Sequence, residues 1–569
     1  MNKKTRLING FKGLDQNSFA DGDPSLSPDM LNFKINAKYE LEKRDGYDSL
    51  SILYGPARAM WSGNIGGGNC LLYVSGGTIQ RYDLSTGTHT KVGSIADKHT
   101  TVFEFAGNVY FLNGADYYRY DGTTFESVEG YIPKIAISCS PNGAGTAYEQ
   151  INLLTAKRRQ IFSANGTDKV FQIAEKEIDN IDYVNINGSS TLLYSKDTAA
   201  GTVTFHTTPT AGINNIEICY SKAHNGRNKI ILSAYSMLFG SNTDTRVFLW
   251  GNPSLPSYRF HSELADGVPS AEYFPENNYT SIGNTKITDI VQQYDRQLIF
   301  TPDSAFYSYC DIRSDSLGKT YSSFPVFSLH STKGNLLSGS SCVIDGKPVT
   351  FCRDGLNIWE PTNIENEKNA VCFSHAIDNT IREISESNDF SGCVLFDYQS
   401  NGECYFAYGG KIYIYNYKLG VWYVYDGINA VSFCDCFGKL YIGSSDNIIF
   451  YFSKRIKTHA AYWTSSYLTL DGENKKKDVI CADIAAQATS DAAMMLEWSD
   501  SENNTDTNGS ISVDFSSNPK QRLLKRRLRI SMRRISAIKL KITAPAQKKL
   551  TLQSIGIGYI TKGDLSYGV

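Results

Sequence analysis

Histidine and cysteine often carry catalysis or bind metals, but their spacing in this chain favours neither role. No two of the eight histidines lie three or four positions apart, so none forms a local zinc-binding pair. The twelve cysteines include no Cys-x-x-Cys motif, and Cys434 and Cys436 are the closest pair. We therefore expect exposed or hydrogen-bonded histidines, reduced and buried cysteines, and no metal or cofactor. The histidines are His89, His99, His206, His224, His261, His330, His375 and His459.

Familiar catalytic motifs are also missing from the sequence. Gly346-Lys347 lacks the upstream glycine of a phosphate-binding loop, and Pro348 replaces its serine or threonine. The segment 354–359 resembles the aspartate box of sialidase blades, but its glycine follows the aspartate too closely, so we expect a blade turn. The many carboxylates leave open a glycosidase, which needs two of them across one glycosidic bond. Our prediction is a protein that is not an enzyme.

One stretch of the sequence is strongly basic. Residues 516–562 contain no Asp or Glu, and apolar and basic side chains alternate within 527–533 and 538–542. Because strand side chains alternate between two faces, this pattern predicts a basic face on paired strands. Three interpretations stay open: a solvated face balanced by acidic neighbours, a protein interface, or transient non-specific contact with DNA. The candidate residues are Arg526, Arg527, Arg529, Arg533, Arg534, Lys539 and Lys541.

The composition indicates strands rather than helices. The 569 residues include 47 Gly, 36 Tyr and 28 Phe, and only 20% are charged. Aromatic residues favour strands, and glycine favours tight turns. The net charge of -2 argues against a broadly basic nucleic-acid coat. No apolar run approaches the roughly 18 residues of a membrane helix, and no secretory signal is evident, so we expect synthesis in a cytoplasm.

Degenerate hairpins recur along the chain. Each joins two short apolar strands through a polar turn, and the second strand often ends in Tyr-Asp, as at Tyr82-Asp83, Tyr120-Asp121 and Tyr425-Asp426. A spacing of roughly 40–50 residues is typical of propeller blades, which bury their faces against one another. We predict an all-β fold with a β-propeller of six to eight blades; two separate β-sandwiches are the alternative. The copies occupy 69–87, 105–122, 293–309, 342–359, 402–426 and 435–452, with a looser one at 246–261.

The segments outside the repeat define the remaining domains. We predict an extended N-terminal arm over 1–49, first blades over 50–135, an inserted small β-sandwich over 136–225, further blades over 226–458 and a C-terminal β-domain over 459–569. Ile377, Ile381 and Ile384 share one helical face and predict a short helix over 376–385, while 500–517 predicts a polar loop. The arm residues expected to make contacts are Leu14, Asp15, Pro24, Leu26, Pro28, Met30 and Phe33.

The N-terminal segment also carries a family resemblance. Its pattern is Gly-Leu-Asp at 13–15, Asp23-Pro24, then Leu26, Pro28, Met30 and Asn32, and finally Arg-x-Gly-Tyr at 44–47. Followed by a degenerate propeller, this pattern resembles the tail nozzle proteins of tailed phages and the packaged-DNA stabilisation proteins of short-tailed phages. Residues 252–274 and 287–290, before the apolar run at 298–300, resemble the central blades of that family.

The resemblance implies a structural protein of the virion tail. In such proteins a ring of copies, commonly six, closes the tail channel below the portal and adaptor, retains the packaged genome and opens during ejection. The expected partners are further copies of this chain, portal, adaptor or other tail proteins, and tail fibres or spikes. A carbohydrate- or receptor-binding propeller is the alternative, and a propeller glycosidase ranks below it.

Overall fold

The computed structural model describes most of the chain, in two compact units. Unit 1 comprises Met1–Ser62, Pro302–Phe306 and Ser328–Val569, and unit 2 comprises Gly63–Thr301 and Tyr307–Phe327. Lys520, Arg522 and Lys548 of the basic stretch, and 501–507 and 516–517 of the predicted loop, lie outside the described residues. The described residues are 2–19, 21–241, 244–314, 320–362, 364–366, 369–453, 459–472, 475–488, 492–500, 508–515, 523–545 and 549–564.

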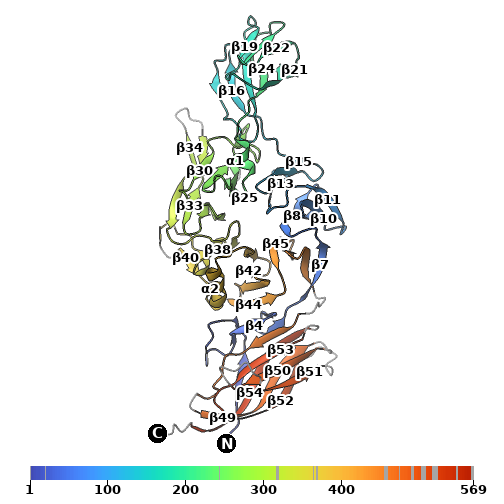
Figure 1. Cartoon of the computed structure of the whole chain (residues 1–569), viewed down its shortest axis with the longest axis vertical. Coiled ribbons are helices and arrows are strands. Elements are labelled where there is room, and N and C mark those ends of the chain that lie inside the picture. The colour runs from blue at the N-terminus through green and yellow to red at the C-terminus, as the bar shows by residue number, and fades with distance from the viewer. Residues whose placement is uncertain are drawn as a thin grey trace. The chain divides into compact units, whose positions relative to one another are not determined.

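Four-stranded meanders form most of unit 2, although residues 57–62, 305–306 and 328–330 of their strands belong to unit 1 (Figure 1). Two small hairpins and a short helix, α1 (Arg227–Ile231), accompany them. The first two meanders are β8 (Ala57–Ile65), β9 (Gly68–Ser75), β10 (Thr78–Asp83) and β11 (His89–Ser94), then β12 (Thr101–Phe105), β13 (Asn108–Leu112), β14 (Tyr117–Tyr120) and β15 (Phe125–Ser127). The next are β25 (Tyr235–Ser241), β26 (Asp244–Trp250), β27 (Tyr258–His261) and β30 (Tyr279–Ser281), then β31 (Asp289–Gln293), β32 (Arg296–Phe300), β33 (Ala305–Tyr309) and β36 (Val326–His330). The hairpins are β28 (Leu264–Ala265) with β29 (Val268–Pro269), and β34 (Asp311–Ser314) with β35 (Thr320–Ser323).

Local turn chemistry explains these meanders. In β9 and β13, runs of consecutive residues are buried, which is the pattern of a strand packed on both faces. In unit 2, the aspartates of the two Tyr-Asp pairs, Asp83 and Asp121, close the turns that follow them. The Asp83 carboxylate accepts hydrogen bonds from the backbone N–H groups of Ser85 and Thr86, at 2.9 and 3.0 Å. The Ser85 hydroxyl, which donates to the same carboxylate at 2.6 Å, and these two N–H groups together lower the pKa of Asp83 to about 2.

The predicted insertion is a two-sheet β-sandwich within unit 2. Its core contains Phe162, Phe171 and Phe205, which meet edge to face at centroid distances of 5.6 and 5.3 Å. One sheet is formed by β16 (Lys134–Cys139), β17 (Thr146–Ala147), β18 (Lys157–Ala164), β20 (Asn180–Ile186), β21 (Ser189–Ser190) and β24 (Gly212–Ser221). The other sheet is formed by β19 (Val170–Gln172), β22 (Tyr194–Asp197) and β23 (Thr202–Phe205).

Three further meanders lie in unit 1. The predicted helix is confirmed as α2 (Asp378–Ser387), where Ile381 and Ile384 are buried after a 3-10 turn that buries Ile377. The meanders are β37 (Cys342–Ile344), β38 (Lys347–Cys352), β39 (Gly355–Trp359) and β40 (Ala370–Cys372); β41 (Val394–Tyr398), β42 (Glu403–Tyr408), β43 (Lys411–Asn416) and β44 (Val421–Asp426); and β45 (Ala430–Cys436), β46 (Lys439–Ser444), β47 (Ile448–Ser453) and β7 (Gly46–Ile52).

The C-terminal domain is built from two sheets, and both include strands from the start of the chain. Its interior belongs to the large core of unit 1, with Trp463, Leu496, Ile542 and Ile557 fully buried. One sheet contains β1 (Lys4–Asn9), β5 (Phe33–Ile35), β6 (Leu41–Lys43), β54 (Leu550–Asp564), β49 (Lys475–Ala488) and β52 (Leu524–Ile535). The other contains β4 (Asp29–Leu31), β48 (Ala461–Thr464), β53 (Lys539–Ala544), β50 (Ala493–Ser499) and β51 (Gly509–Asp514).

The architecture is therefore all-β, as predicted: a β-propeller with an inserted β-sandwich and a C-terminal β-domain. Seven sheets of the described residues contain four strands in meander order, which lies inside the expected range of six to eight. The number of blades that close into one ring stays a prediction. The N-terminal segment, which we predicted as an extended arm, pairs its strands with sheets of unit 1.

Candidate interaction surfaces

The N-terminal segment, residues 4–52, acts as a clasp within unit 1. Strand β1 pairs with β54, β4 with β48, and β7 with β47. The short strand β2 (Gly13–Leu14) joins the edge of β44, and β3 (Leu26–Ser27) pairs with β2. Strands this short have few partners within their own segment, so neighbouring sheets must supply them. We call residues 4–52 the N-terminal clasp.

The residues expected to make arm contacts are mostly turned into unit 1. Leu14, Met30 and Phe33 are no more than 3% exposed, so their side chains offer no surface to a partner. Asp15 accepts a hydrogen bond from the backbone N–H of Asn17 at 3.0 Å. Pro24, Leu26 and Pro28 are half-buried. Sequence reasoning selected structurally important residues here, but their contacts are intramolecular.

Asn32 is the central residue of the clasp. Its backbone N–H donates to the Val424 carbonyl at 2.8 Å, and its side-chain amide donates to Asp426 at 2.6 Å and to the Ala460 carbonyl at 2.8 Å. The Asn32 side-chain oxygen accepts from the Asp426 N–H at 3.1 Å. The residue has a φ of 58°, a left-handed conformation that asparagine tolerates better than most residues. One side chain thus joins β44 to the chain just before β48.

The Arg-x-Gly-Tyr part of the pattern continues this role. The Arg44 guanidinium lies 5.3 Å from the centre of the Tyr425 ring, and burial lowers the pKa of Arg44. Gly46 and Tyr47 begin β7, and the Tyr47 ring packs 4.7 Å from Phe450 and 5.4 Å from His459. The residues that carry the resemblance therefore bind sheet to sheet inside unit 1.

Most of the predicted basic residues lie on β52, an edge strand of its sheet. The side chains of Arg526, Arg527, Arg529, Arg533 and Arg534 are exposed, while the intervening Leu528, Ile530 and Met532 are buried. The predicted alternation is therefore confirmed for this strand. Charged side chains also protect an exposed strand edge from pairing with other chains. We call these five arginines the β52 arginine row.

Acidic neighbours balance part of this row. Both Asp483 carboxylate oxygens accept from Arg527, at 2.6 and 3.0 Å, and this contact lowers the pKa of Asp483. Asp478 accepts from the backbone N–H of Arg534 at 2.9 Å and lies 3.3 Å from Lys562. The solvated interpretation therefore fits Arg527 best.

The expectation that both basic stretches share one face was wrong. Strand β52 pairs with β49, whereas β53 lies in the other sheet between β48 and β50, because each stretch pairs with a different part of the C-terminal domain. Lys539 and Lys541 lie over the rings of Tyr467 and Tyr462, with each Nζ 5.3 and 5.0 Å from its ring centre. These two lysines therefore belong to a different surface from the β52 arginine row.

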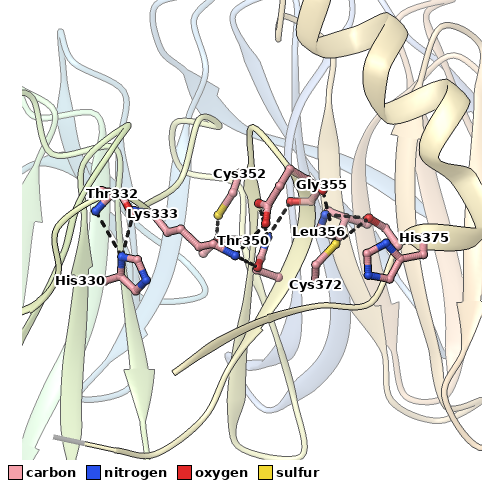
Figure 2. Close-up of polar contacts among 12 residues, drawn as sticks. His330, Thr332, Lys333, Thr350, Cys352, Gly355, Leu356, Cys372 and His375 are labelled. Atoms are coloured by element: carbon pink, nitrogen blue, oxygen red, sulfur yellow. Dashed lines mark hydrogen bonds and ion pairs between the residues drawn. The ribbon is translucent and has the colours of Figure 1, made fainter. Parts of the chain in front are cut away.

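The segment that resembles an aspartate box lies in a polar cluster beside β38 and β39 (Figure 2). The Lys333 ammonium donates to Asp354 at 2.7 Å and to the Asn357 side-chain oxygen at 2.9 Å, and Asn357 in turn donates to Asp354 at 2.9 Å. The Trp359 indole donates to the Thr350 hydroxyl at 2.9 Å. These bonds close the turn between two strands, which is the blade-turn role that we expected.

This cluster lacks an activated nucleophile. Burial raises the pKa of Cys352 to about 12, so its sulfur stays a protonated thiol at neutral pH. His330 Nδ1 accepts from the backbone N–H groups of Thr332 and Lys333, at 3.2 and 3.1 Å (Figure 2). Its imidazole therefore stabilises the local turn. These contacts describe structural stabilisation rather than catalysis.

The described residues contain neither a metal-binding cluster nor a membrane-spanning helix. Within them, no group of three or more His, Cys, Asp or Glu side chains is arranged to hold a metal ion. The twelve cysteines all lie among the described residues and form no disulfides, and all but Cys310 and Cys372 are buried. The helices of the described ranges include none with the length and hydropathy needed to span a bilayer.

Comparisons with known proteins place few constraints on function. No family model and no curated protein matches the chain. The computationally designed Ika8 protein aligns at 10% identity and a TM-score of 0.31, over 71% of this chain and 99% of its own. The exo-beta-1,3-galactanase of Phanerochaete chrysosporium aligns at 9% identity and a TM-score of 0.18, over 82% and 96% respectively. An auxiliary nutrient binding protein of Bacteroides thetaiotaomicron aligns at 8% identity and a TM-score of 0.26, over 79% and 77%. Scores this low carry no argument about function.

Proposed function

We propose that this chain is a structural subunit of a bacteriophage tail. Copies, commonly six in the family that it resembles, would form a nozzle or tail-hub ring that closes the DNA channel, retains the genome and opens for ejection. Other tail proteins would dock on its outer surfaces. The supporting observation is the N-terminal clasp: the residues that carry the family resemblance, such as Asn32 and Arg44, bind the sheets of unit 1 together.

A clasp of this kind suits a subunit under mechanical load. Pulling one sheet of unit 1 away from another requires several strand pairings to break together, because β1, β4 and β7 pair with different sheets. Hydrogen bonds that must break together resist force better than bonds that open one at a time. A ring that holds pressurised DNA needs this property more than it needs a deep pocket.

The β52 arginine row is the candidate contact surface of the ring. A cyclic ring requires two different patches on each copy that fit each other head to tail. An exposed arginine row suits an acidic patch on the next copy or transient contact with DNA phosphates. The net charge of -2 keeps phosphate contacts few elsewhere, which suits DNA that must slide during ejection.

The ring can be tested with the purified full-length protein. Native mass spectrometry should give a closed oligomer, and electron micrographs of the same sample should show a central channel. If the protein stays monomeric, gold-labelled antibodies against it should be applied to the phage particles released at lysis. The position of the label then tests the tail role. Label at the tail end supports the proposal, and label absent from every particle contradicts it.

A further inference from the structure

A cavity of about 220 Å³ lies between two meanders of unit 1, where the N-terminal clasp adds to its wall. Its apolar lining is mainly aromatic. The rings of Tyr398 and Tyr405 meet edge to face at 6.2 Å, and those of Tyr425 and Phe452 do so at 5.7 Å. Pockets for drug-sized ligands usually measure about 300–1,000 Å³, so this one suits a smaller molecule such as a single sugar ring.

A fixed carboxylate belongs to the polar lining. Glu403 is 8% exposed, and its two oxygens accept hydrogen bonds from the hydroxyls of Tyr405 and Tyr423, at 2.8 and 2.5 Å. The side-chain amide of Asn401 lies 3.4 Å from the same carboxylate. Among the described residues, no lysine or arginine forms an ion pair with Glu403. The carboxylate is therefore held in place while keeping lone pairs for a further donor.

The remaining polar lining mixes donors with acceptors. Lys34 lies 3.4 Å from Glu42, and the Lys439 ammonium lies 3.3 Å from the centre of the Tyr451 ring. Asp45 forms an ion pair with Lys549 at 2.9 Å. Lysines Lys34 and Lys439 and acids Asp45 and Glu403 thus line one cavity.

This mixture selects among ligand charges. The lining holds two positive and two negative groups, so neither a cation nor an anion gains a net attraction, and either ion loses hydration and meets like charges on entering. A neutral polyhydroxy compound avoids both costs, because each hydroxyl donates to a carboxylate and accepts from a lysine or an amide. Its C–H faces can also pack on the four aromatic rings, burying apolar area.

We propose that this cavity binds one neutral sugar residue. The Glu403 carboxylate and the Asn401 amide hold hydroxyl groups, and the rings of Tyr398 and Tyr425 contact the sugar's apolar face. The proposal goes beyond the tail-ring function and does not depend on it, because a monomer would carry the same cavity.

Saturation-transfer NMR on the full-length chain tests this proposal. The probes are D-glucose, D-galactose, D-mannose, N-acetyl-D-glucosamine and L-rhamnose, with putrescine and inorganic phosphate as charged comparators. We expect saturation transfer to at least one sugar and to neither charged probe. Glu403→Gln and Asn401→Ala should each weaken binding of that sugar about tenfold, the effect of one lost hydrogen bond to a charged or fixed polar group. Asn277→Ala, at an exposed position in unit 2, is the matched control and should bind normally.

Three results would overturn the proposal. One is no transfer to any sugar at about 10 mM, above the millimolar dissociation constants of weak ligands. Another is binding that survives both substitutions, and the last is transfer to putrescine or phosphate in place of the sugars. Glu403→Gln removes a buried acceptor and can impair folding, so its thermal unfolding is checked first. The exposed Asn401 position keeps the test valid if that variant fails to fold.

Discussion

Two strand ends with the same sequence, Tyr-Asp, are used differently in the two units. In unit 2, the Asp121 carboxylate after β14 accepts from the backbone N–H groups of Thr123 and Thr124, both at 2.7 Å. In unit 1, the Asp426 carboxylate at the end of β44 accepts from the side chain of Asn32, 394 residues away in the sequence. The first aspartate closes its own turn, and the second binds the N-terminal clasp.

The difference shows that one repeat motif can serve either a local or a distant contact. The Asp121 turn needs only the three residues that follow it, so any blade can form it independently. The Asp426 contact requires the clasp to be in place, because its donor comes from another part of the chain. Breaking each contact in turn should therefore have local effects in unit 2 and wider effects in unit 1.

Asn32→Ala should give the largest effect. It removes three side-chain hydrogen bonds and leaves alanine at a φ of 58°, which should lower the free energy of unfolding of unit 1 by about 4 kcal/mol. Hydrogen exchange measured by mass spectrometry should show faster exchange in β44 and β48. Thr123→Ala, at the Asp121 turn, is the matched control and should speed exchange only at that turn. If both variants speed hydrogen exchange equally and only near the substituted residue, the Asp426 and Asp121 contacts do not differ in reach.

Gly13→Ala should have the second largest effect. A Cβ atom there would lie 2.2 Å from the Trp422 carbonyl oxygen, so β2 would have to separate from β44. We expect a loss of about 3 kcal/mol in thermal or urea unfolding. Gly420→Ala is the control, because its φ of +68° is also left-handed but no atom lies within 4 Å of the added Cβ. If the two variants lose equal stability, backbone conformation alone explains the effect and the close contact is unimportant.

A pH titration should isolate the contribution of His459 in unit 1 from that of Asp121 in unit 2. Burial and the nearby Arg44 lower the pKa of His459 from 6.5 to about 4, so the unfolded chain takes up this proton first as pH falls. Unit 1 should therefore lose stability between about pH 6.5 and pH 4, whereas Asp121, with a pKa of about 2, loses its contribution only between pH 3.8 and 2. His459→Gln should reduce the loss of unfolding free energy between about pH 6.5 and pH 4. His261 in unit 2 also has a lowered pKa, of about 3. The contribution of His459 is therefore measured as the difference between the unsubstituted protein and His459→Gln.

The smallest effect on stability should come from the β52 arginine row. Changing Arg527, Arg529 and Arg533 together to Glu should alter unfolding by less than about 1 kcal/mol, because these side chains are exposed. The same variant should fail to form rings in native mass spectrometry. Lys539 and Lys541 changed to Glu form the control, because they lie in the other sheet and should leave rings intact. If only the control variant fails to form rings, the interface lies on β53 and not on β52.

Patterns within one short segment were predictable from the sequence. Hairpins around Tyr82-Asp83 and Tyr120-Asp121, the buried face of α2 and the alternation in β52 each depend on neighbouring residues. Strand pairing between distant segments was not predictable in the same way. The N-terminal clasp was expected to be an extended arm, because strands of two or three residues carry too little periodicity to reveal a partner hundreds of positions away.

The two candidate sites also differ in whether their residues come from one segment or from several. The arginine row was visible in the sequence because its residues are consecutive in one strand. The cavity around Glu403 was not, because its lining comes from β5, β41, β42, β44, β46 and β47, and only the folded chain brings these segments together. The many tyrosines of the repeat gave only a general signal, because aromatic side chains line binding pockets as well as cores.

The pairing of β1 with β54 determines when unit 1 can finish folding during translation. Lys4 is translated 555 residues before its partner Tyr559. The meanders of unit 2 are contiguous and can form while translation continues, but unit 1 must wait until β54 emerges. Until then, its unpaired strand edges are open to chaperones and to neighbouring nascent chains. A chain released before β54 is made therefore lacks these pairings, and its unpaired strand edges mark it for cellular proteases.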